Sequence, residues 1–299
     1  MIRDLTRLVS IIALTVTLSL MTACSGGNTV TDTVEDAVRS IDPRIRVMQS
    51  GPYEIHLLDK ETARLESEGG FRIFRDRQLV LEEWGMTGSR FYISSEREDH
   101  PLRDQIGIDV TGNGVPNLVI VEYTMGNRCC LWFHVIELGE EVRKIAFVDG
   151  TYGAGAGLLT PDTPGEPWGL EITDPSFAAW KASYAESLYP TVILTYQDGE
   201  FRIDPSRMVR PPLPEDDFHA RVTYWQDLQH WHEDIPPHAL RHELLEWIYQ
   251  GNLKQATELL DLVWPPEISG KSDFMSALLV QLTRSPHWDA IAAMQHRYE

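Results

Sequence analysis

The sequence predicts an α+β protein in which an antiparallel, β-rich domain precedes a C-terminal α-helical region. Across residues 51–210, short runs of β-branched and aromatic residues are separated by Gly, Asp, Asn and Pro, which is typical of short antiparallel strands. Across residues 217–299, apolar residues recur instead every three to four positions, the period of an amphipathic helix.

The N-terminal residues 1–23 are predicted to be a signal peptide. Arg3 and Arg7 precede an apolar run from Leu8 to Leu20. This run is shorter than the roughly 20 apolar residues that a membrane span needs, and its length suits a secretory signal. It ends in Met-Thr-Ala-Cys, in which two small residues precede Cys24.

This "MTAC" stretch resembles the lipobox of bacterial lipoproteins, with Met21 where Leu is usual. The resemblance implies cleavage before Cys24, a diacylglyceryl group on its thiol and a further acyl chain, such as palmitate, on its amine. Two or more chains give stable membrane anchoring. Ser25 replaces the Asp that favours inner-membrane retention, so the resemblance implies the cell envelope, either the periplasmic face of the outer membrane or the cell surface. The alternative is an ordinary signal peptide with a chance cysteine.

Residues 24–50 are polar and small and are predicted to form a lipidated tether. The charge of the chain argues against nucleic acid as a partner. It has 26 Lys and Arg against 45 Asp and Glu, a net charge of −19. Removal of residues 1–23 leaves 24 against 44, a net of −20. Such a surface repels phosphate groups.

The β-rich domain contains a clear hairpin signal, the Asp-Gly pair within Gln197–Phe201. Two segments, "IGIDVTGN" near residue 107 and "WGLEITDP" near residue 168, begin alike, which hints at repetition with a blade-like period. The strands are therefore expected to form a meander or a partial propeller-like arrangement.

Four helices with short connectors are expected in the C-terminal region, which predicts antiparallel hairpins. The first covers His238–Gln250, between two prolines and Gly251. Asn252, Ser272 and Ser285 are predicted to cap the following three, the last with Pro286 at its first position.

The segment "DVTGNGVPNLVIVEY", from Asp109 to Tyr123, has the spacing of a calcium loop. Such loops place oxygen ligands at alternate positions, with glycine at the bend, here Gly114. The ligands would be Asp109, Thr111, Asn113, the carbonyl of Val115, and Asn117. A single carboxylate predicts weak, roughly millimolar Ca²⁺ binding. The alternative is a metal-free turn, held by Asx hydrogen bonds and by glycines with positive φ.

This segment resembles the loop of FG-GAP/VCBS repeats, which usually carries Asp at the positions of Asn113 and Asn117. It is also similar to a group of uncharacterised exported bacterial proteins, in which the loop leads into a glycine-containing turn and a cysteine pair, as "TMGNRCC" does here. The resemblance covers roughly residues 105–135. It implies a β-rich extracytoplasmic domain and no particular function.

Two further side-chain groups are candidates for chemistry. Cys129 and Cys130 are adjacent in a chain predicted for an oxidising compartment, so either a vicinal disulfide in a distorted turn or two separate thiols are expected. His230, His232, His238 and His242 form a cluster. The last two share a helix face and suit Zn²⁺ or Cu²⁺, although clustered surface histidines are the alternative.

These features predict a non-enzymatic exported lipoprotein that binds or scaffolds at the cell envelope. Its partners would be the membrane, through the lipid anchor, and an unknown protein or glycan. The alternative is a hydrolase acting on envelope carbohydrate or peptide through carboxylates or the histidine cluster. Convergent polar groups in a deep cleft would favour the enzyme, and a shallow apolar patch would favour the binder.

Overall fold

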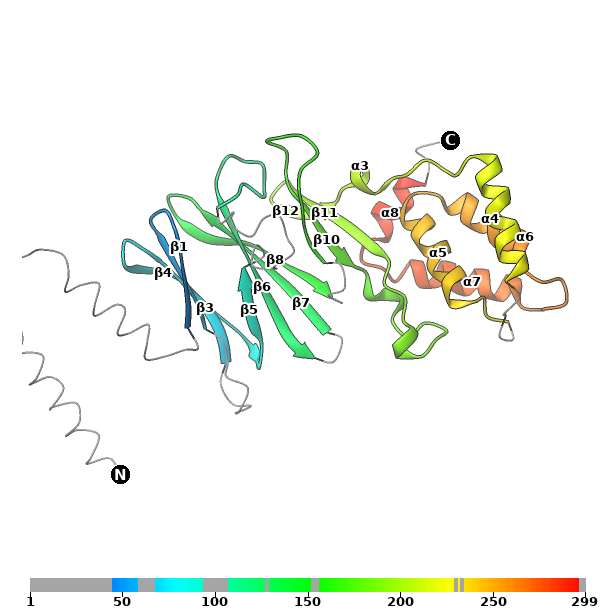
Figure 1. Ribbon diagram of the computed structural model, residues 1–299, viewed down its shortest axis with the longest axis horizontal. Coiled ribbons are helices and arrows are strands. Elements are labelled where there is room, and N and C mark those ends of the chain that lie inside the picture. The colour runs from blue at the N-terminus through cyan, green and yellow to red at the C-terminus, as the bar shows by residue number, and fades with distance from the viewer. Residues whose placement is uncertain are drawn as a thin grey trace, which may run out of the picture. The chain divides into compact units, whose positions relative to one another are not determined.

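The computed structural model describes residues 45–58, 68–93, 107–126, 129–151, 156–228, 231 and 234–295. The signal peptide, Cys24 and most of the predicted tether lie outside these residues. Within them, the strands form three four-stranded sheets, in each of which the strand order follows the chain (Figure 1). Helices follow the third sheet, which confirms the expected fold class: antiparallel meanders and then an α-helical region.

Sheets A, B and C are built from successive parts of the chain. Sheet A contains β1 (Ile45–Ser50), β2 (Tyr53–Leu58), β3 (Glu68–Arg75) and β4 (Gln78–Thr87). Sheet B contains β5 (Arg90–Ile93), β6 (Asn117–Gly126), β7 (Cys129–Leu138) and β8 (Val142–Thr151). Sheet C contains β9 (Gly157–Leu159), β10 (Gly169–Thr173), β11 (Thr191–Gln197) and β12 (Glu200–Ile203). The expected Asp-Gly hairpin connects β11 and β12.

Strand β1 covers Ile45–Ser50, so the β structure begins before residue 51, the expected start of the β-rich domain. The run "IRVMQS" is short and alternates only weakly, so its strand pattern is weak. Its neighbour in sheet A is β2, which supplies its backbone hydrogen-bond partners. Such pairing cannot be predicted from the residues of one strand alone.

Strand β6 of sheet B is buried on both faces, which explains its continuous apolar run "LVIV". One face packs against sheet A through Leu118, Ile120, Ile136 and Leu138, which meet Ile55, Leu57, Phe71 and Ile73. The other face contributes Val119, Phe133 and Val135 to a second core, shared with sheet C and the helices. Because successive side chains point to opposite faces, one strand can serve both cores.

The helical region comprises α4 (Glu215–Asp227), α5 (His238–Tyr249), α6 (Leu253–Val263), α7 (Lys271–Leu282) and α8 (Trp288–Met294). Three shorter segments precede it, the 3₁₀ helices η2 (Pro175–Phe177) and η3 (Tyr184–Glu186) and the helix α3 (Pro205–Met208). Helices α5 to α8 correspond to the four expected helices. Helix α4 was not predicted, because its buried side chains, Phe218, Val222 and Trp225, form a narrow stripe among charged residues.

Three predicted helix caps differ from the structure. Helix α7 begins at Lys271 after Gly270, so Ser272 is not its capping residue. Helix α8 begins at Trp288, two residues later than expected, but the Ser285 hydroxyl still accepts from the backbone N–H of His287 at 3.0 Å, as a capping side chain does. Asn252 does occupy the N-cap of α6, but its side-chain amide donates to the carbonyl of Arg210 instead of accepting a bond from the helix. At Asn252 a long-range partner has therefore replaced the local capping bond.

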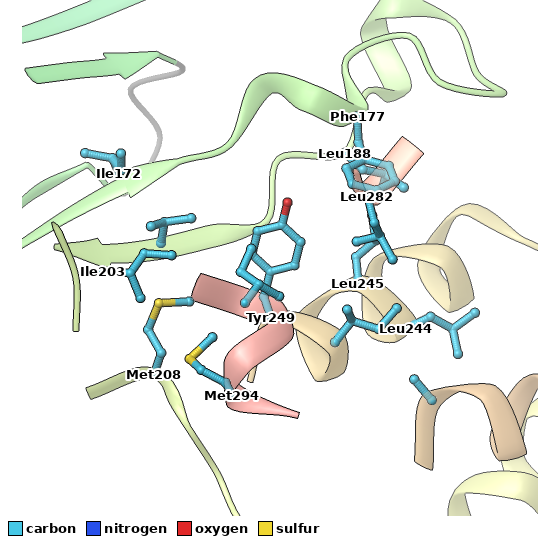
Figure 2. Packing of buried hydrophobic residues seen from close by; sticks show 14 of the residues in the cluster. Ile172, Phe177, Leu188, Ile203, Met208, Leu244, Leu245, Tyr249, Leu282 and Met294 are labelled. Atoms are coloured by element: carbon cyan, nitrogen blue, oxygen red, sulfur yellow. The ribbon is translucent and has the colours of Figure 1, made fainter. Parts of the chain in front are cut away.

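Sheet C and the helices share one hydrophobic core. Figure 2 shows Tyr249 of α5 within it, between Ile203 and Met208 on one side and Leu244 and Leu245 on the other. Tyr249 is fully buried, and its hydroxyl needs a hydrogen-bond partner there.

That partner is Asp174, at the N-cap of η2 and directly after β10. Its carboxylate has no exposed surface. Atom Oδ2 accepts from the Tyr249 hydroxyl at 2.6 Å and from the Ser285 hydroxyl, and Oδ1 accepts from the Ser176 backbone N–H at 2.8 Å. One carboxylate thus joins sheet C, α5 and the connection between α7 and α8.

We predict that Asp174→Ala lowers the free energy of unfolding by about 2 to 5 kcal/mol, because it leaves two buried hydroxyl donors without an acceptor. Asp204 is the matched control. It caps α3 within the same Asp-Pro-Ser sequence and accepts from Ser206 N at 2.9 Å, but it makes no long-range bond of this kind. Asp204→Ala should cost about 1 kcal/mol. Urea denaturation measures both, and equal losses would contradict the role given to Asp174.

Candidate functional site

A cavity of about 470 Å³ lies between the edge strand β8 and sheet C, and we call it the β8 cavity. Its wall on sheet B is the continuous segment Ile145–Asp149. Sheet C and its connections supply Ile172, Thr173, Pro175, Leu194, Gly199, Glu200 and Phe201, and Pro286 and His287 close the helical end. Most of these side chains are apolar, and the volume is in the range of small-ligand sites.

Few polar groups border the β8 cavity. Thr173 and His287 lie at its helical end, and Asp149 and Glu200 belong to the two strands at its sides. Burial lowers the pKa of His287, and the charge of Asp174 offsets this shift only in part. The His287 ring is therefore uncharged at neutral pH, when it can both donate and accept a hydrogen bond.

Asp174, Ser285 and His287 do not form a nucleophilic triad. Such a triad needs the serine hydroxyl to bond to the imidazole, with the carboxylate behind the imidazole. Here the hydroxyl of Ser285 donates to Asp174 and accepts from the backbone N–H of His287 at 3.0 Å. Ser285 is also buried. This group therefore has a structural role beside the cavity.

Two carboxyl groups with raised pKa values lie elsewhere, on β10 and α5. Burial raises the pKa of Glu171 and also that of Glu246, to which the charge of Glu171 adds a small further increase. Atom Oε1 of Glu246 accepts from the backbone N–H of Thr191 at 3.4 Å. Neither residue borders the β8 cavity. The carboxylates that do border it are Asp149 and Glu200.

The calcium-like loop is closed by its own hydrogen bonds. Asp109 Oδ2 accepts from Gly114 N at 2.7 Å, and Oδ1 accepts from Asn113 N and from the Thr111 hydroxyl, both at 3.2 Å. Asn113 Oδ1 accepts from Val115 N at 2.8 Å. The predicted ligand residues are thus brought together, and their oxygens are directed at N–H and O–H donors.

Asn117 is turned to the buried side of this loop. Its Oδ1 accepts from Val110 N at 2.8 Å and from Thr111 N at 3.1 Å. Gly112 and Gly114 have φ of +72° and +83°, the left-handed region expected for them. A Cβ atom on Gly112 would also lie 2.9 Å from the backbone nitrogen of Pro167, so only glycine fits there.

Glu137 of β7 adds a second carboxylate beside the loop, which the sequence pattern did not identify. Its Oε2 accepts from the Asn113 side-chain amide at 3.0 Å, and its Oε1 accepts from Arg143 at 2.8 Å. The pKa of Glu137 is lowered, first by the bond from Asn113 and then by Arg143. Glu137 lies beside the loop only because β7 pairs with β6, so the spacing of residues within the loop cannot reveal it.

The cysteine and histidine candidates are described only in part. Cys130 is disulfide-bonded, and its backbone N–H donates to the Thr124 hydroxyl at 2.9 Å. The side chain of Cys129 lies outside the described residues, as do His230 and His232, so the vicinal bridge stays a prediction. His238 and His242 are exposed on α5, and the described part of the chain holds no group of three or more metal-binding side chains.

A further buried polar group lies between sheets A and B. Glu122 accepts from the Ser89 hydroxyl at 2.6 Å and from Met86 N at 2.9 Å, and its Oε2 lies 3.0 Å from His134 Nε2. Burial acts to raise the pKa of Glu122, but these hydrogen bonds, that of His134 foremost, outweigh it and keep the pKa low. The group is enclosed by Phe71 and Phe91 and joins the two sheets.

No protein-family model, no curated protein and no solved structure matches this chain. In the part of the chain that the structure describes, no helix has the length and apolar character needed to cross a bilayer. The site must therefore be interpreted from its own geometry.

The loop geometry refines the calcium prediction. At about ten times a millimolar dissociation constant, Ca²⁺ would stabilise the wild-type fold by only ~1.4 kcal/mol. Asn113→Asp removes the hydrogen bond to Glu137 and sets three carboxylates together, so in chelator it should lower stability by about 1 kcal/mol. Millimolar Ca²⁺ should then raise its melting temperature more than that of wild type.

Asn113→Ala is the control for the lost hydrogen bond, because it adds no charge. Its response to Ca²⁺ should be no larger than that of the wild type. Thermal denaturation in EDTA and in millimolar Ca²⁺ compares the three proteins. A wild-type protein that unfolds on chelation and recovers in micromolar Ca²⁺ would contradict a self-sufficient loop.

Proposed function

We propose that this chain is an exported lipoprotein that binds a largely apolar ligand in the β8 cavity at the cell envelope. The observation that carries the binding function is the cavity itself, an apolar space of about 470 Å³ with Thr173 and His287 at one end. Ligand sites combine such apolar walls with a few polar groups that fix orientation.

The support for export and anchoring comes from the N-terminal sequence. Arg3 and Arg7, the apolar run from Leu8 to Leu20 and the "MTAC" stretch together have the order of a lipoprotein signal. In this proposal, residues 24–44 lead from the anchor at Cys24 to strand β1, which begins at Ile45. The anchor brings the β8 cavity to ligands at the membrane surface.

The anchoring part predicts that Cys24→Ala moves the protein from the membrane to the soluble fraction. The substitution removes the acyl chains, which are the source of stable membrane binding. Expression in a bacterium with lipoprotein processing, followed by membrane fractionation, measures the change. A Cys24→Ala protein that still fractionates fully with membranes would disprove lipid anchoring through this residue.

The binding part predicts that an uncharged apolar fluorophore, N-phenyl-1-naphthylamine, binds the β8 cavity and gains fluorescence there. Ala146 lies opposite Val135, on the face of β8 that is directed to sheet C. Ala146→Phe should therefore fill the cavity and weaken binding by about tenfold or more, ~1.4 kcal/mol.

Ala220→Phe, on the exposed surface of α4, is the matched control and should leave the affinity unchanged. Circular dichroism checks that each variant is folded. Equal affinity of wild type and a folded Ala146→Phe variant would show that the fluorophore binds elsewhere, and it would remove the support for this cavity as the binding site.

A further inference from the structure

Strand β8 is the edge of sheet B. Within the described residues its only paired strand is β7. An edge strand presents a row of backbone N–H and C=O groups to whatever lies beside it, and proteins normally cover or interrupt such an edge. What lies beside β8 is the β8 cavity.

The wall residues show which part of β8 borders the cavity. Ala146 and Val148 lie opposite Val135 and Phe133, toward sheet C, whereas Phe147 lies opposite His134, toward sheet A. Side chains on opposite faces of a strand cannot fill one space on either face. Five consecutive residues, Ile145–Asp149, nevertheless line the same cavity. Residues from both faces of β8 can line one cavity only if that cavity lies along the backbone edge of the strand.

We propose that the β8 cavity takes an extended peptide segment of a partner protein, which pairs with the edge of β8 as a fifth strand of sheet B. This inference rests on the binding function proposed above. Main-chain hydrogen bonds supply affinity in such strand addition, and pockets for alternate side chains supply specificity. Ile145 is the extra residue of a bulge, and the four regularly paired wall residues, Ala146–Asp149, match a partner segment of about 13 Å.

The residues on the two sides of the β8 cavity determine which side chains of this peptide would fit. On the sheet C side, an added strand meets Ile172, Leu194 and Phe201, which favours apolar residues at alternate positions. On the opposite side it meets the half-exposed Phe147, beside Asp149.

The charge of the cavity lining determines which residues the peptide can carry between its apolar positions. Asp149 and Glu200 line the cavity, no Lys or Arg does, and the whole chain has a net charge of −19. Arg202 donates a hydrogen bond of 2.5 Å to Glu200 and partly neutralises its charge, so the overall negative field carries most of the selection. The peptide therefore alternates apolar residues with basic or uncharged polar ones.

The test uses the blocked peptide acetyl-Lys-Val-Thr-Val-Lys-amide as the probe, with calorimetry and displacement of N-phenyl-1-naphthylamine as the measurements. Alternate residues of a strand direct their N–H groups to opposite edges. Methylation of the two valine amide nitrogens blocks one edge of the peptide, and methylation of the other three blocks the other edge. One of these sets should weaken binding by about tenfold or more, and the other by less than about threefold.

A peptide that binds equally well with either methylated set would overturn strand addition, as would one that loses binding with both. The matched peptide acetyl-Glu-Val-Thr-Val-Glu-amide should bind about tenfold more weakly at low salt. An equal affinity for the two charges would overturn the proposed selection.

The outcomes separate this inference from the proposed function. If the fluorophore binds, responds to Ala146→Phe and is not displaced by the peptide, the peptide proposal fails and the binding function stands. If the fluorophore does not bind at all, the binding function fails first. A concentration-dependent dimer that excludes the fluorophore would assign the edge to a second copy of this chain and would overturn a peptide partner.

Discussion

The buried carboxylate of Asp174 is the interaction on which the C-terminal half of this protein depends. It has no exposed surface, and it accepts hydrogen bonds from Tyr249, Ser285 and Ser176. Burial and the charge of Asp174 raise the pKa of Tyr249 far above its ordinary value, so this hydroxyl stays a donor. Because a buried charge without partners is costly, sheet C and the helices must keep one arrangement. That arrangement places Pro286 and His287 at the end of the β8 cavity.

Sheet B imposes the second constraint. One of its faces packs against sheet A and the other against sheet C, and β8 at its edge keeps exposed side chains such as Phe147. The part of sheet B that remains for binding is the backbone edge of β8, which borders the largely apolar β8 cavity. The Glu122–His134 pair in the inner layer fixes sheet A on sheet B and takes no part in this cavity. The binding function and the peptide inference both follow from this geometry.

The calcium-like loop shows which features of a site follow from the spacing of its residues. Its spacing correctly predicted that Asp109, Thr111 and Asn113 come together around a bend at Gly114. Spacing does not determine where each oxygen is directed. Asn117 accepts from backbone N–H groups on the buried side, and Asn113 donates to Glu137, which lies on a different strand. The stability of the loop therefore also depends on Glu137, a residue outside the loop motif.

The sequence by itself determined the fold class, the hairpin at Asp198–Gly199 and four of the helices, because hydrophobic period and turn residues are local properties. It did not identify β1, it placed α4 in the helical region without naming it as a separate helix, and it placed the start of α7 too late. Ser285 shows the limit of a local pattern: its hydroxyl accepts a local bond from His287 N and also donates to Asp174, more than one hundred residues away. The β8 cavity was decided only by the tertiary structure. Its walls come from Ile145–Asp149, from sheet C and from His287, and no local sequence property records that these segments meet.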